Sequence, residues 1–400
     1  MEKPIPYGKQ FLSEEDIKSV VEVLNSDFLT QGPQIEAFET AFSNYVNAKH
    51  GVAVNNGTAA LHIALKALGV ETDQYVLVPP ITFAASANCI EYNNATPLFT
   101  EVDVHGLMDL NHVEALVKKY GSKIRGAIPV QYAGKAVNLK RLKEILAKIN
   151  AWILEDACHA PGGSFEQASA SFNCGDGQYA DASIFSFHPV KHIATGEGGM
   201  VTTPCLQIKQ RLQTLRTHGI TRDSNIFQNP VDLANGESQQ ADYPNWYMEM
   251  QELGYNYRLT DFQAALGISQ LANAKANLEK RREIARYYIQ ELKNLPLELP
   301  FENADSPDIN QHALHLFVIK TEKRRKLYDF LRSHMVFAQV HYFPVHLMPY
   351  YRQKYGYNPG DLPSAEHFYS NCLSIPMFPS LETEEIDKVV RLIKAFFHNG

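Results

Sequence analysis

The sequence of 400 residues is poor in the features that mark several common protein classes. Its five cysteines are scattered, odd in number and never spaced as CxxC, which argues against a disulfide scaffold or a zinc finger and favours a reducing compartment. No uncharged apolar run reaches the ~18 residues of a membrane span, and no signal-like segment begins the chain, so we expect a cytoplasmic protein. With 37 Lys and Arg against 44 Asp and Glu, the net charge of −7 gives no support to nucleic-acid or membrane-surface binding.

What the sequence does contain is a repeated alternation of short apolar runs with helical patterns. The runs have the length and continuous hydrophobicity of strands buried on both faces, and they cover residues 51–54, 75–78, 97–102, 126–130, 152–155, 183–187 and 200–203. Amphipathic patterns such as 112–120 and 139–149 lie between them. This alternation predicts an α/β fold with a parallel sheet covered by helices.

The two ends of the chain differ from this middle part. Ser13, followed by three acids, predicts a capped helix, and Pro33 predicts the start of a second one. A polar stretch over 220–246 is typical of a long loop without a regular element, and because loops of that length are uncommon in compact domains we expect it to be functional or to lie at an interface. Residues 260–295 predict one or two long helices. We therefore expect a large α/β domain at 13–270 and a smaller α+β domain formed by 271–400 together with 1–12.

A turn with small residues follows the first predicted strand. Gly57, Thr58 and Ala59 stand where a strand passes into a helix, so bare amides and the positive helix end point at the same place. Such a turn can bind phosphate, but a plain glycine turn capped by Thr58 explains the same residues. It is neither a Walker loop nor GxGxxG.

Carboxylates and a histidine stand at the end of another strand. Either Glu155 or Asp156 could hold a cationic ring nitrogen, and His159 follows three residues later. A helix cap by Asp156 with a structural His159 is an equally good explanation of this segment alone.

A lysine follows the sixth predicted strand. Lys191 stands after Ser186 and before the glycine-rich residues 196–199, where burial could lower its pKa and free the amine to attack a carbonyl. On its own this is a weak indication, because most lysines are solvated. Together, a phosphate turn, an aspartate and a lysine are the groups that pyridoxal 5′-phosphate (PLP) requires for its phosphate, ring nitrogen and aldehyde.

Other cofactors fit the sequence less well. A nicotinamide dehydrogenase would need the glycine fingerprint and a ribose-binding acid at its usual spacing, and both are missing. The histidines, including His341 and His346 in a proline-rich loop, show no metal-ligand spacing, so we expect no metal.

The chain resembles the DegT/StrS-type sugar aminotransferases, which act on nucleotide-linked keto-sugars. The likeness extends over nearly the whole chain and lies in residues 29–33, 56–61, 78–83, 155–160, 186–191, 196–199 and 254–261, in that order. It implies a fold-type I PLP-dependent transferase, with a mostly parallel seven-stranded sheet in the large domain. A branch of the family that carries histidine in place of the lysine runs as a dehydratase, and Lys191 favours transamination here.

Within the family, the likeness is greatest to the aminotransferases of pseudaminic acid synthesis, in residues 23–32, 132–135 and 338–342. It implies transfer of the amino group of L-glutamate to the 4-keto carbon of a UDP-2-acetamido-2,6-dideoxy-hexos-4-ulose. Related 4-keto sugars on UDP, GDP or dTDP remain alternatives. A non-catalytic PLP-binding regulator is a further one, although the complete set of reactive groups argues against it.

The resemblance also implies roles for individual residues. Lys191 would bond to the cofactor aldehyde and move the proton to the sugar carbon, Asp156 would pair with the ring nitrogen, and His159 would approach the ring hydroxyl. The remaining cofactor contacts would come from Gly57, Thr58, Ala59, Phe83 and Ser186, with Asn256 supplied by the partner of a homodimer. The substrate side would comprise Tyr7, Asp27, Leu29, Thr30, Arg258, His315, His341 and Tyr342.

Two stretches depart from the family pattern. Residues 165–179 are longer than we expect between the histidine and the next strand, and 225–242 are also extended. The resemblance predicts no role for either stretch.

Overall fold

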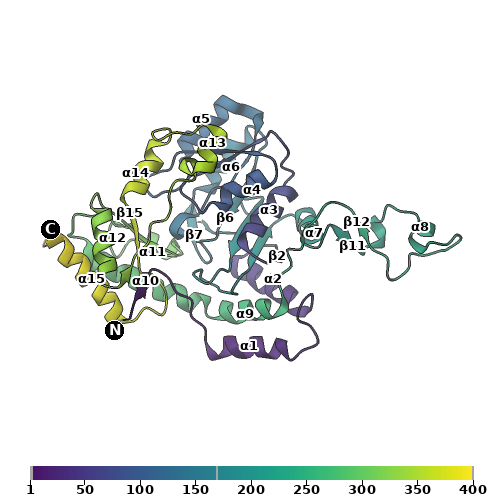
Figure 1. The fold of residues 1–400 in the computed structure, drawn as a ribbon, viewed down its shortest axis with the longest axis horizontal. Coiled ribbons are helices and arrows are strands. Elements are labelled where there is room, and N and C mark those ends of the chain that lie inside the picture. The colour runs from purple at the N-terminus through teal and green to yellow at the C-terminus, as the bar shows by residue number, and fades with distance from the viewer. Residues whose placement is uncertain (1–2, 168–169, 399–400) are drawn as a thin grey trace.

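A single mixed sheet forms the centre of the molecule. The computed structural model describes residues 3–167 and 170–398 (Figure 1). The sheet has seven strands in the order β2-β10-β9-β6-β5-β3-β4. Its members are β2 (His50–Val54), β3 (Tyr75–Val78), β4 (Thr96–Phe99), β5 (Ile124–Ala127), β6 (Trp152–Asp156), β9 (Ala182–Ser186) and β10 (Gly199–Thr203). Only β10 runs antiparallel to its neighbours in the described sheet, so the predicted mostly parallel sheet is confirmed.

Each of the seven predicted apolar runs overlaps one strand of this sheet, because both faces are buried. Along β9, Ile184 belongs to one apolar cluster while Phe185 belongs to another. The first cluster also takes in α3 and the helices near β3 to β6, and the second takes in Phe38 and Phe42. Alternate residues of one strand therefore face different layers, and neither face could tolerate a polar pattern.

The helices of the first two thirds of the chain surround this sheet. They are α1 (Glu14–Leu24), α2 (Pro33–Val46), α3 (Gly57–Ala67), α4 (Ala85–Tyr92), α5 (Leu110–Tyr120), α6 (Leu139–Ala147), α7 (Leu206–Leu215) and α9 (Asp261–Ala272), with short 3₁₀ turns at Gly121–Lys123 and Tyr132–Gly134. Ser13 and Asp16 form the capping box that starts α1, and Pro33 is the first residue of α2, as predicted. Helices α1 and α9 lie side by side at the bottom of Figure 1.

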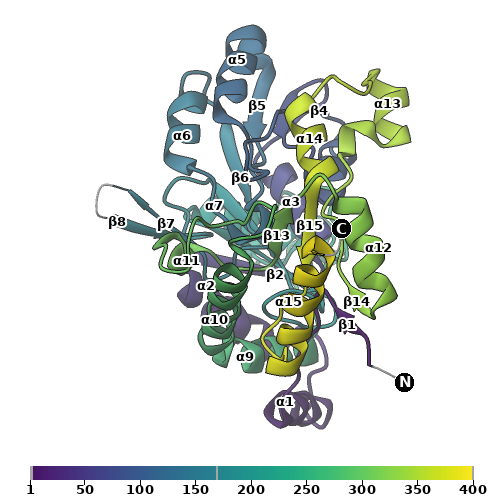
Figure 2. The ribbon, with the colours of Figure 1, turned by 90° about the vertical axis from the view of Figure 1, so that its left-hand side faces the viewer.

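The C-terminal elements share two apolar clusters: Val345, Tyr351, Ala365 and Phe368 belong to the first cluster, and most of the others gather in a third. These elements are α10 (Ala274–Leu292), α11 (Asp308–Gln311), β13 (Phe317–Lys320), α12 (Arg324–Ser333), β14 (Val336–Phe337), a 3₁₀ turn at Val345–Leu347, α13 (Pro349–Tyr355), α14 (Pro363–Asn371), β15 (Cys372–Ile375) and α15 (Thr383–His398). The N-terminal strand β1 (Ile5–Pro6) pairs with β14, and Ile5 is buried in the third cluster. Figure 2 shows α12 and α15 close to β14 and β1. We keep the division into 13–270 and 271–400 with 1–12 as a proposal that the third cluster supports.

Two segments stand out from the body. The first is a hairpin of β7 (Ser164–Gln167) and β8 (Ala170–Asn173), which occupies part of the stretch flagged at 165–179 and protrudes in Figure 2; residues 168 and 169 lie outside the described residues. The second, which we call the arm, covers residues 220–250. It contains β11 (Ile220–Thr221), a 3₁₀ turn (Ser224–Ile226), α8 (Val231–Asn235) and β12 (Glu249–Met250), and extends far from the sheet in Figure 1.

The expectation that 220–246 holds no regular element was therefore wrong in detail. The pairing of β11 with β12 closes the arm at its base, and such pairing between segments nearly thirty residues apart leaves little pattern in either segment alone. In the described part of the chain, no helix is long and apolar enough to cross a membrane.

Candidate active site

The reactive residues gather at one edge of the sheet. Strands β2, β3, β6 and β9 all run in the same direction, so the residues that follow them meet at the carboxyl edge, where open α/β sheets bind ligands. Asp156 ends β6, Ser186 ends β9, and Lys191 lies in the loop after β9. Gly57 and Phe83 follow β2 and β3. The structure thus brings together groups from four parts of the sequence.

Asp156 presents a buried carboxylate with only neutral partners. Its side chain is 5% exposed, and its oxygens accept hydrogen bonds from Ser86 Oγ at 2.7 Å and from the Cys158 amide at 3.2 Å. Ser86 in turn bonds to Thr82. No ion pair reaches this carboxylate within the described residues. A buried anion without a cation calls for a positively charged ligand group, because burial of an unpaired charge is costly.

Glu155 takes a different environment, although it is the next residue of the strand. Its carboxylate accepts bonds from Gln131 Nε2 at 2.6 Å, Ser183 Oγ at 2.7 Å and the Gly175 amide at 2.9 Å. Burial raises its pKa, while these three donors oppose that effect. Since successive strand residues point to opposite faces, Glu155 is fully engaged away from Asp156, and only Asp156 is available to a ligand of the two.

Lys191 carries an amine prepared for nucleophilic or base chemistry. Burial lowers the pKa of its ammonium, and the nearby Cys158 and Asp156 only partly oppose that. Within the described residues, no acceptor is bonded to Nζ. The backbone amide of Lys191 donates to the His188 carbonyl, which closes a tight turn after β9. A lysine with a lowered pKa is more often neutral near pH 7, and the neutral amine is the nucleophilic form.

The turn before α3 offers two free amides at a helix end. Asn56 caps the helix by accepting from the Ala59 amide at 2.8 Å, so that amide, which we expected to serve a phosphate, is already engaged. Among the described residues nothing accepts from the amides of Gly57 and Thr58. A Cβ at position 57 would lie 3.0 Å from the Cβ of Ser186, so glycine lets the turn approach the end of β9 closely. Two amides, a hydroxyl and a helix N-terminus form a plausible phosphate cradle.

Histidines surround the lysine on the other side. His159 Nδ1 accepts from the Ala133 amide at 3.3 Å, so its Nε2 must carry the proton that is shared with the Tyr342 hydroxyl at 3.2 Å. The ring of His315 lies 4.3 Å from that of His159. Burial is the main cause that holds the pKa of both imidazoles well below the usual value, and the Lys191 charge adds to it. Both rings are therefore neutral near pH 7.

The remaining wall comes from aromatic residues and one further histidine. His341 Nδ1 bonds to Ser374 Oγ at 2.9 Å, and burial lowers its pKa to about 3. Its ring contacts that of Tyr7 at 5.0 Å, and Tyr342 stacks on His159. Phe83 is 65% exposed, and its ring lies 6.4 Å from that of Tyr342. We call Lys191, Asp156, His159, His315, His341 and Tyr342 the lysine cluster.

Four other predicted substrate residues, together with Asn256, which was predicted as a cofactor contact, lie apart from the lysine cluster. Asp27, Leu29, Thr30 and Asn256 are exposed, and Arg258 lines a separate polar cavity of about 470 Å³ beside Glu39 and Arg216. These five residues are called the open group here. A bridge between Thr30 and Thr260 ties two of their segments together, but no contact in the described part of the chain joins the open group to Lys191.

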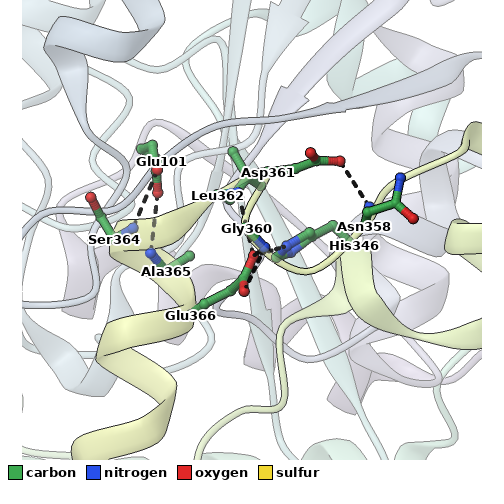
Figure 3. Close-up of polar contacts among 9 residues, drawn as sticks. All are labelled: Glu101, His346, Asn358, Gly360, Asp361, Leu362, Ser364, Ala365 and Glu366. Atoms are coloured by element: carbon green, nitrogen blue, oxygen red, sulfur yellow. Dashed lines mark hydrogen bonds and ion pairs between the residues drawn. The ribbon is translucent and has the colours of Figure 1, made fainter.

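The segment that follows Tyr342 is anchored to the large sheet. Figure 3 shows Glu101, just after β4, accepting from the amides of Ser364 and Ala365 at the start of α14. Nearby, Glu366 accepts from the Gly360 amide and meets the buried His346 at 3.3 Å. The Val345 amide donates to the Pro80 carbonyl. These contacts hold the chain between His341 and α14 at the rim of the site.

Sequence reasoning missed several residues of this site. Ser86, the partner of Asp156, stands inside α4 and shows no pattern of its own. The Ala133 amide fixes the tautomer of His159, and Ala133 has a left-handed backbone with φ of 58°. A non-glycine residue in that conformation leaves no signal in a sequence, although the glycine beside it in the Tyr132–Gly134 turn does.

Comparison with known proteins gives a consistent result. Residues 10–394 match the DegT/DnrJ/EryC1/StrS aminotransferase family. The spore coat polysaccharide biosynthesis protein SpsC of Bacillus subtilis is 33% identical, over 98% of this chain and 96% of the relative. The UDP-4-amino-4,6-dideoxy-N-acetyl-beta-L-altrosamine transaminase of Campylobacter jejuni is 32% identical, over 95% of this chain and 94% of the relative.

Solved structures agree along the whole chain. PseC of Helicobacter pylori, an aminotransferase of pseudoaminic acid biosynthesis, superposes with a TM-score of 0.85 at 29% identity and full coverage of both chains. The PLP form of Spr1654 from Streptococcus pneumoniae gives 0.85 at 25% identity, over 99% of both chains.

Proposed function

The chain belongs to the DegT/DnrJ/EryC1/StrS aminotransferase family, and we propose that it transfers the amino group of L-glutamate to the 4-keto carbon of a UDP-2-acetamido-2,6-dideoxy-hexos-4-ulose. As a family member it is a sugar aminotransferase that uses PLP. The names of the Campylobacter relative and of PseC support the particular sugar and the place in pseudaminic acid synthesis.

One observation carries the assignment to this site: a partly buried amine with a lowered pKa lies near a buried carboxylate that has no ion-pair partner. Lys191 and Asp156 are the only such pair at the carboxyl edge in the described chain. The unpaired amides of Gly57 and Thr58, next to Ser186, fit the phosphate of PLP. When bound, PLP supplies an electron sink that makes the bond from the amino-bearing carbon to hydrogen acidic.

Each residue of the lysine cluster then has a definite task. In its neutral form, Lys191 Nζ would accept the proton from the amino-bearing carbon of glutamate; in its protonated form, in the second half of the reaction, it would donate a proton to the sugar C4. Asp156, whose two hydrogen-bond partners are both neutral, would pair with the positively charged ring nitrogen of the cofactor. His159, whose Nε2 carries a proton, orients the Tyr342 hydroxyl. Because its ring stays neutral, it adds no positive charge beside Lys191.

The walls provide orientation and exclude water. The rings of Tyr7, His341 and Tyr342 contact one another beside the lysine, and the less polar face of a sugar ring can pack against them. Phe83 is exposed above Tyr342, in a position to cover the other side of a bound ring. The open group would be supplied to a neighbouring chain in a homodimer, which accounts for its exposure and for its distance from the lysine cluster.

A substrate panel tests this proposal. Purified protein, loaded with PLP and supplied with glutamate, is offered UDP-, GDP- and dTDP-linked 4-keto and 3-keto sugars, and the amino sugars are identified by mass spectrometry. We expect turnover to be fastest with the UDP-linked 4-keto N-acetyl sugar. Turnover with dTDP-sugars alone would overturn the substrate but leave the sugar aminotransferase activity intact. A chain that binds PLP but never accepts the amino group of glutamate would contradict the proposed reaction.

A further inference from the structure

His192, the residue after Lys191, connects the loop that follows β9 to the segment around Ala313. His192 Nε2 lies 2.7 Å from the Ala313 carbonyl oxygen. Because a carbonyl can only accept, this nitrogen must carry the ring proton, and Nδ1 must be bare. Within the described residues Nδ1 is buried and has no partner. The imidazole is thus held in one tautomer by a single bond to the backbone of a distant segment.

The same segment is held from its other side by a buried arginine. Arg281, on α10, donates from Nη1 to the Leu314 carbonyl at 3.1 Å and to the Met377 carbonyl at 2.9 Å. No carboxylate pairs with its guanidinium in the described chain. Burial first, and then this positive charge, lower the pKa of His192 well below the usual value. The neutral imidazole of His192 and the charged guanidinium of Arg281 therefore donate hydrogen bonds to adjacent carbonyls, those of residues 313 and 314.

These two bonds help to hold the backbone just before His315, together with the bonds from the Ala313 amide to the Gly134 carbonyl and from the Leu314 amide to His312 Nδ1. Leu314 has a left-handed backbone with φ of 53°, which a leucine adopts only when its surroundings enforce it. The next residue, His315, places its ring 4.3 Å from His159 and 5.6 Å from His192. The Leu316 amide then donates to the Ala133 carbonyl, and the Ala133 amide donates to His159. A continuous series of contacts thus connects His192 with His159.

We propose that His192 is a positioning residue for amino transfer: its Nε2–H fixes the Ala313 carbonyl, so that His315 packs against His159 and keeps water away from the Lys191 amine. The inference deepens the proposed function, because it takes Lys191 as the reacting amine. His192 touches neither the substrate nor the cofactor in this scheme. Its effect on the chemistry passes entirely through the placement of His315.

Two amide substitutions separate positioning from simple loss of a side chain. In His192→Gln the amide nitrogen takes the place of Nε2 and can still donate to Ala313, whereas in His192→Asn it takes the place of Nδ1 and falls short. We measure the pH dependence of Lys191 acylation by mass spectrometry in cofactor-free protein. His192→Asn should raise the apparent pKa of the amine by about one unit, since water gains access to it. His192→Gln should leave this pKa near that of the wild type.

Kinetics of the PLP-loaded enzyme give the second readout. His192→Asn should lower kcat by about 10- to 100-fold while KM for the keto sugar changes less, because misplacement at a reacting centre affects the chemical step most. His192→Gln should recover kcat to within about threefold. His334→Asn, an exposed histidine at the end of α12, serves as the matched control and should change neither readout.

The outcomes decide the proposal in each direction. Equal pKa and kcat values for the Asn and Gln variants would overturn it. If His192→Asn does not fold, as judged by thermal unfolding, His192→Leu replaces it as the variant without a donor. A wild-type chain that forms no visible cofactor band would contradict the role of Lys191, while the acylation experiment would still report on the bond between His192 and Ala313.

Discussion

The lysine cluster and the open group are two parts of one predicted site with opposite character. In the lysine cluster Asp156, His159, His341 and Tyr342 have hydrogen-bond partners, and the histidine rings are buried. The open group is mostly exposed, and its side chains have almost no described partners. A single chain therefore assembles the reactive groups completely, while the part expected to select the substrate lacks a surface opposite it. The difference fits the proposed homodimer, in which the chemistry is preorganised within the chain and substrate selection depends on assembly.

The largest effect should follow from removal of the reacting amine. We expect Lys191→Ala to abolish the visible cofactor band and to lower amino transfer by about 10⁴-fold or more, because no other described amine lies at this position. Absorbance and product formation measure the two losses. Lys118→Ala, at an exposed lysine of α5, should behave as the wild type. An active Lys191→Ala variant would remove the basis of the comparison.

The two adjacent carboxylates should respond in different ways. Asp156→Asn should keep the fold and lower kcat by about 10²- to 10³-fold, since it removes a negative charge that faces the ligand. Glu155→Gln should instead lower the free energy of unfolding by about 1–3 kcal/mol, because an amide cannot accept from all three donors. Chemical denaturation and steady-state kinetics, run on both variants, test the contrast. Equal effects of the two substitutions would contradict it.

Complementation tests whether the open group serves a second chain. Asn256→Ala should be impaired about 10- to 100-fold if its amide holds the cofactor phosphate of the partner. Co-expression with Lys191→Ala should then restore up to about a quarter of wild-type activity, because half of the sites in each mixed dimer would be intact.

The opposite result is just as clear. The carbonyl of Tyr257 accepts from the Asn55 amide, so the backbone beside Asn256 runs close to the phosphate turn of its own chain. If Asn256 serves that turn, mixed dimers contain no intact site and activity is not restored.

The smallest effect concerns the buried His312, which lies outside the lysine cluster. Burial lowers the pKa of His312 to about 3, from 6.5, so the folded chain binds fewer protons than the unfolded one at acidic pH. Stability is therefore lost as the pH falls from about 6.5 towards 3. His312→Asn keeps an acceptor for the Leu314 amide, and should reduce the loss between pH 7 and 4.5 by about 1–2 kcal/mol. Parallel unfolding curves for variant and wild type would show that His312 does not contribute.

Much of the fold could be predicted because the large sheet is buried on both faces. Continuous apolar runs of strand length, such as 75–78, favour strands that are buried on both faces, and the predicted helix starts at Ser13 and Pro33 depend on local chemistry alone. The hairpin of β7 and β8 and the arm could not be predicted in the same way. Their strands are short and partly polar, and only their partners make them strands.

The site shows the same limit. The order of turn, aspartate and lysine along the chain indicated a common edge, and the structure places Gly57, Asp156 and Lys191 there. The choice between Glu155 and Asp156 depended on which face of β6 each occupies, and the engagement of the Ala59 amide depended on the Asn56 rotamer. Neither property is encoded by residue type. In the proposed homodimer the open group would face the lysine cluster of a second chain, and no pattern within one sequence specifies such a contact.

The three bonds to Glu155 also act as a register lock on β6. A slip of one residue that put Asp156 among Gln131, Ser183 and Gly175 would leave a carboxylate too short to span all three donors. The same slip would move Glu155 back to the position of Leu154, away from the carboxyl end of the strand. The central strand is thereby protected against a misalignment that would withdraw the acid from the ligand.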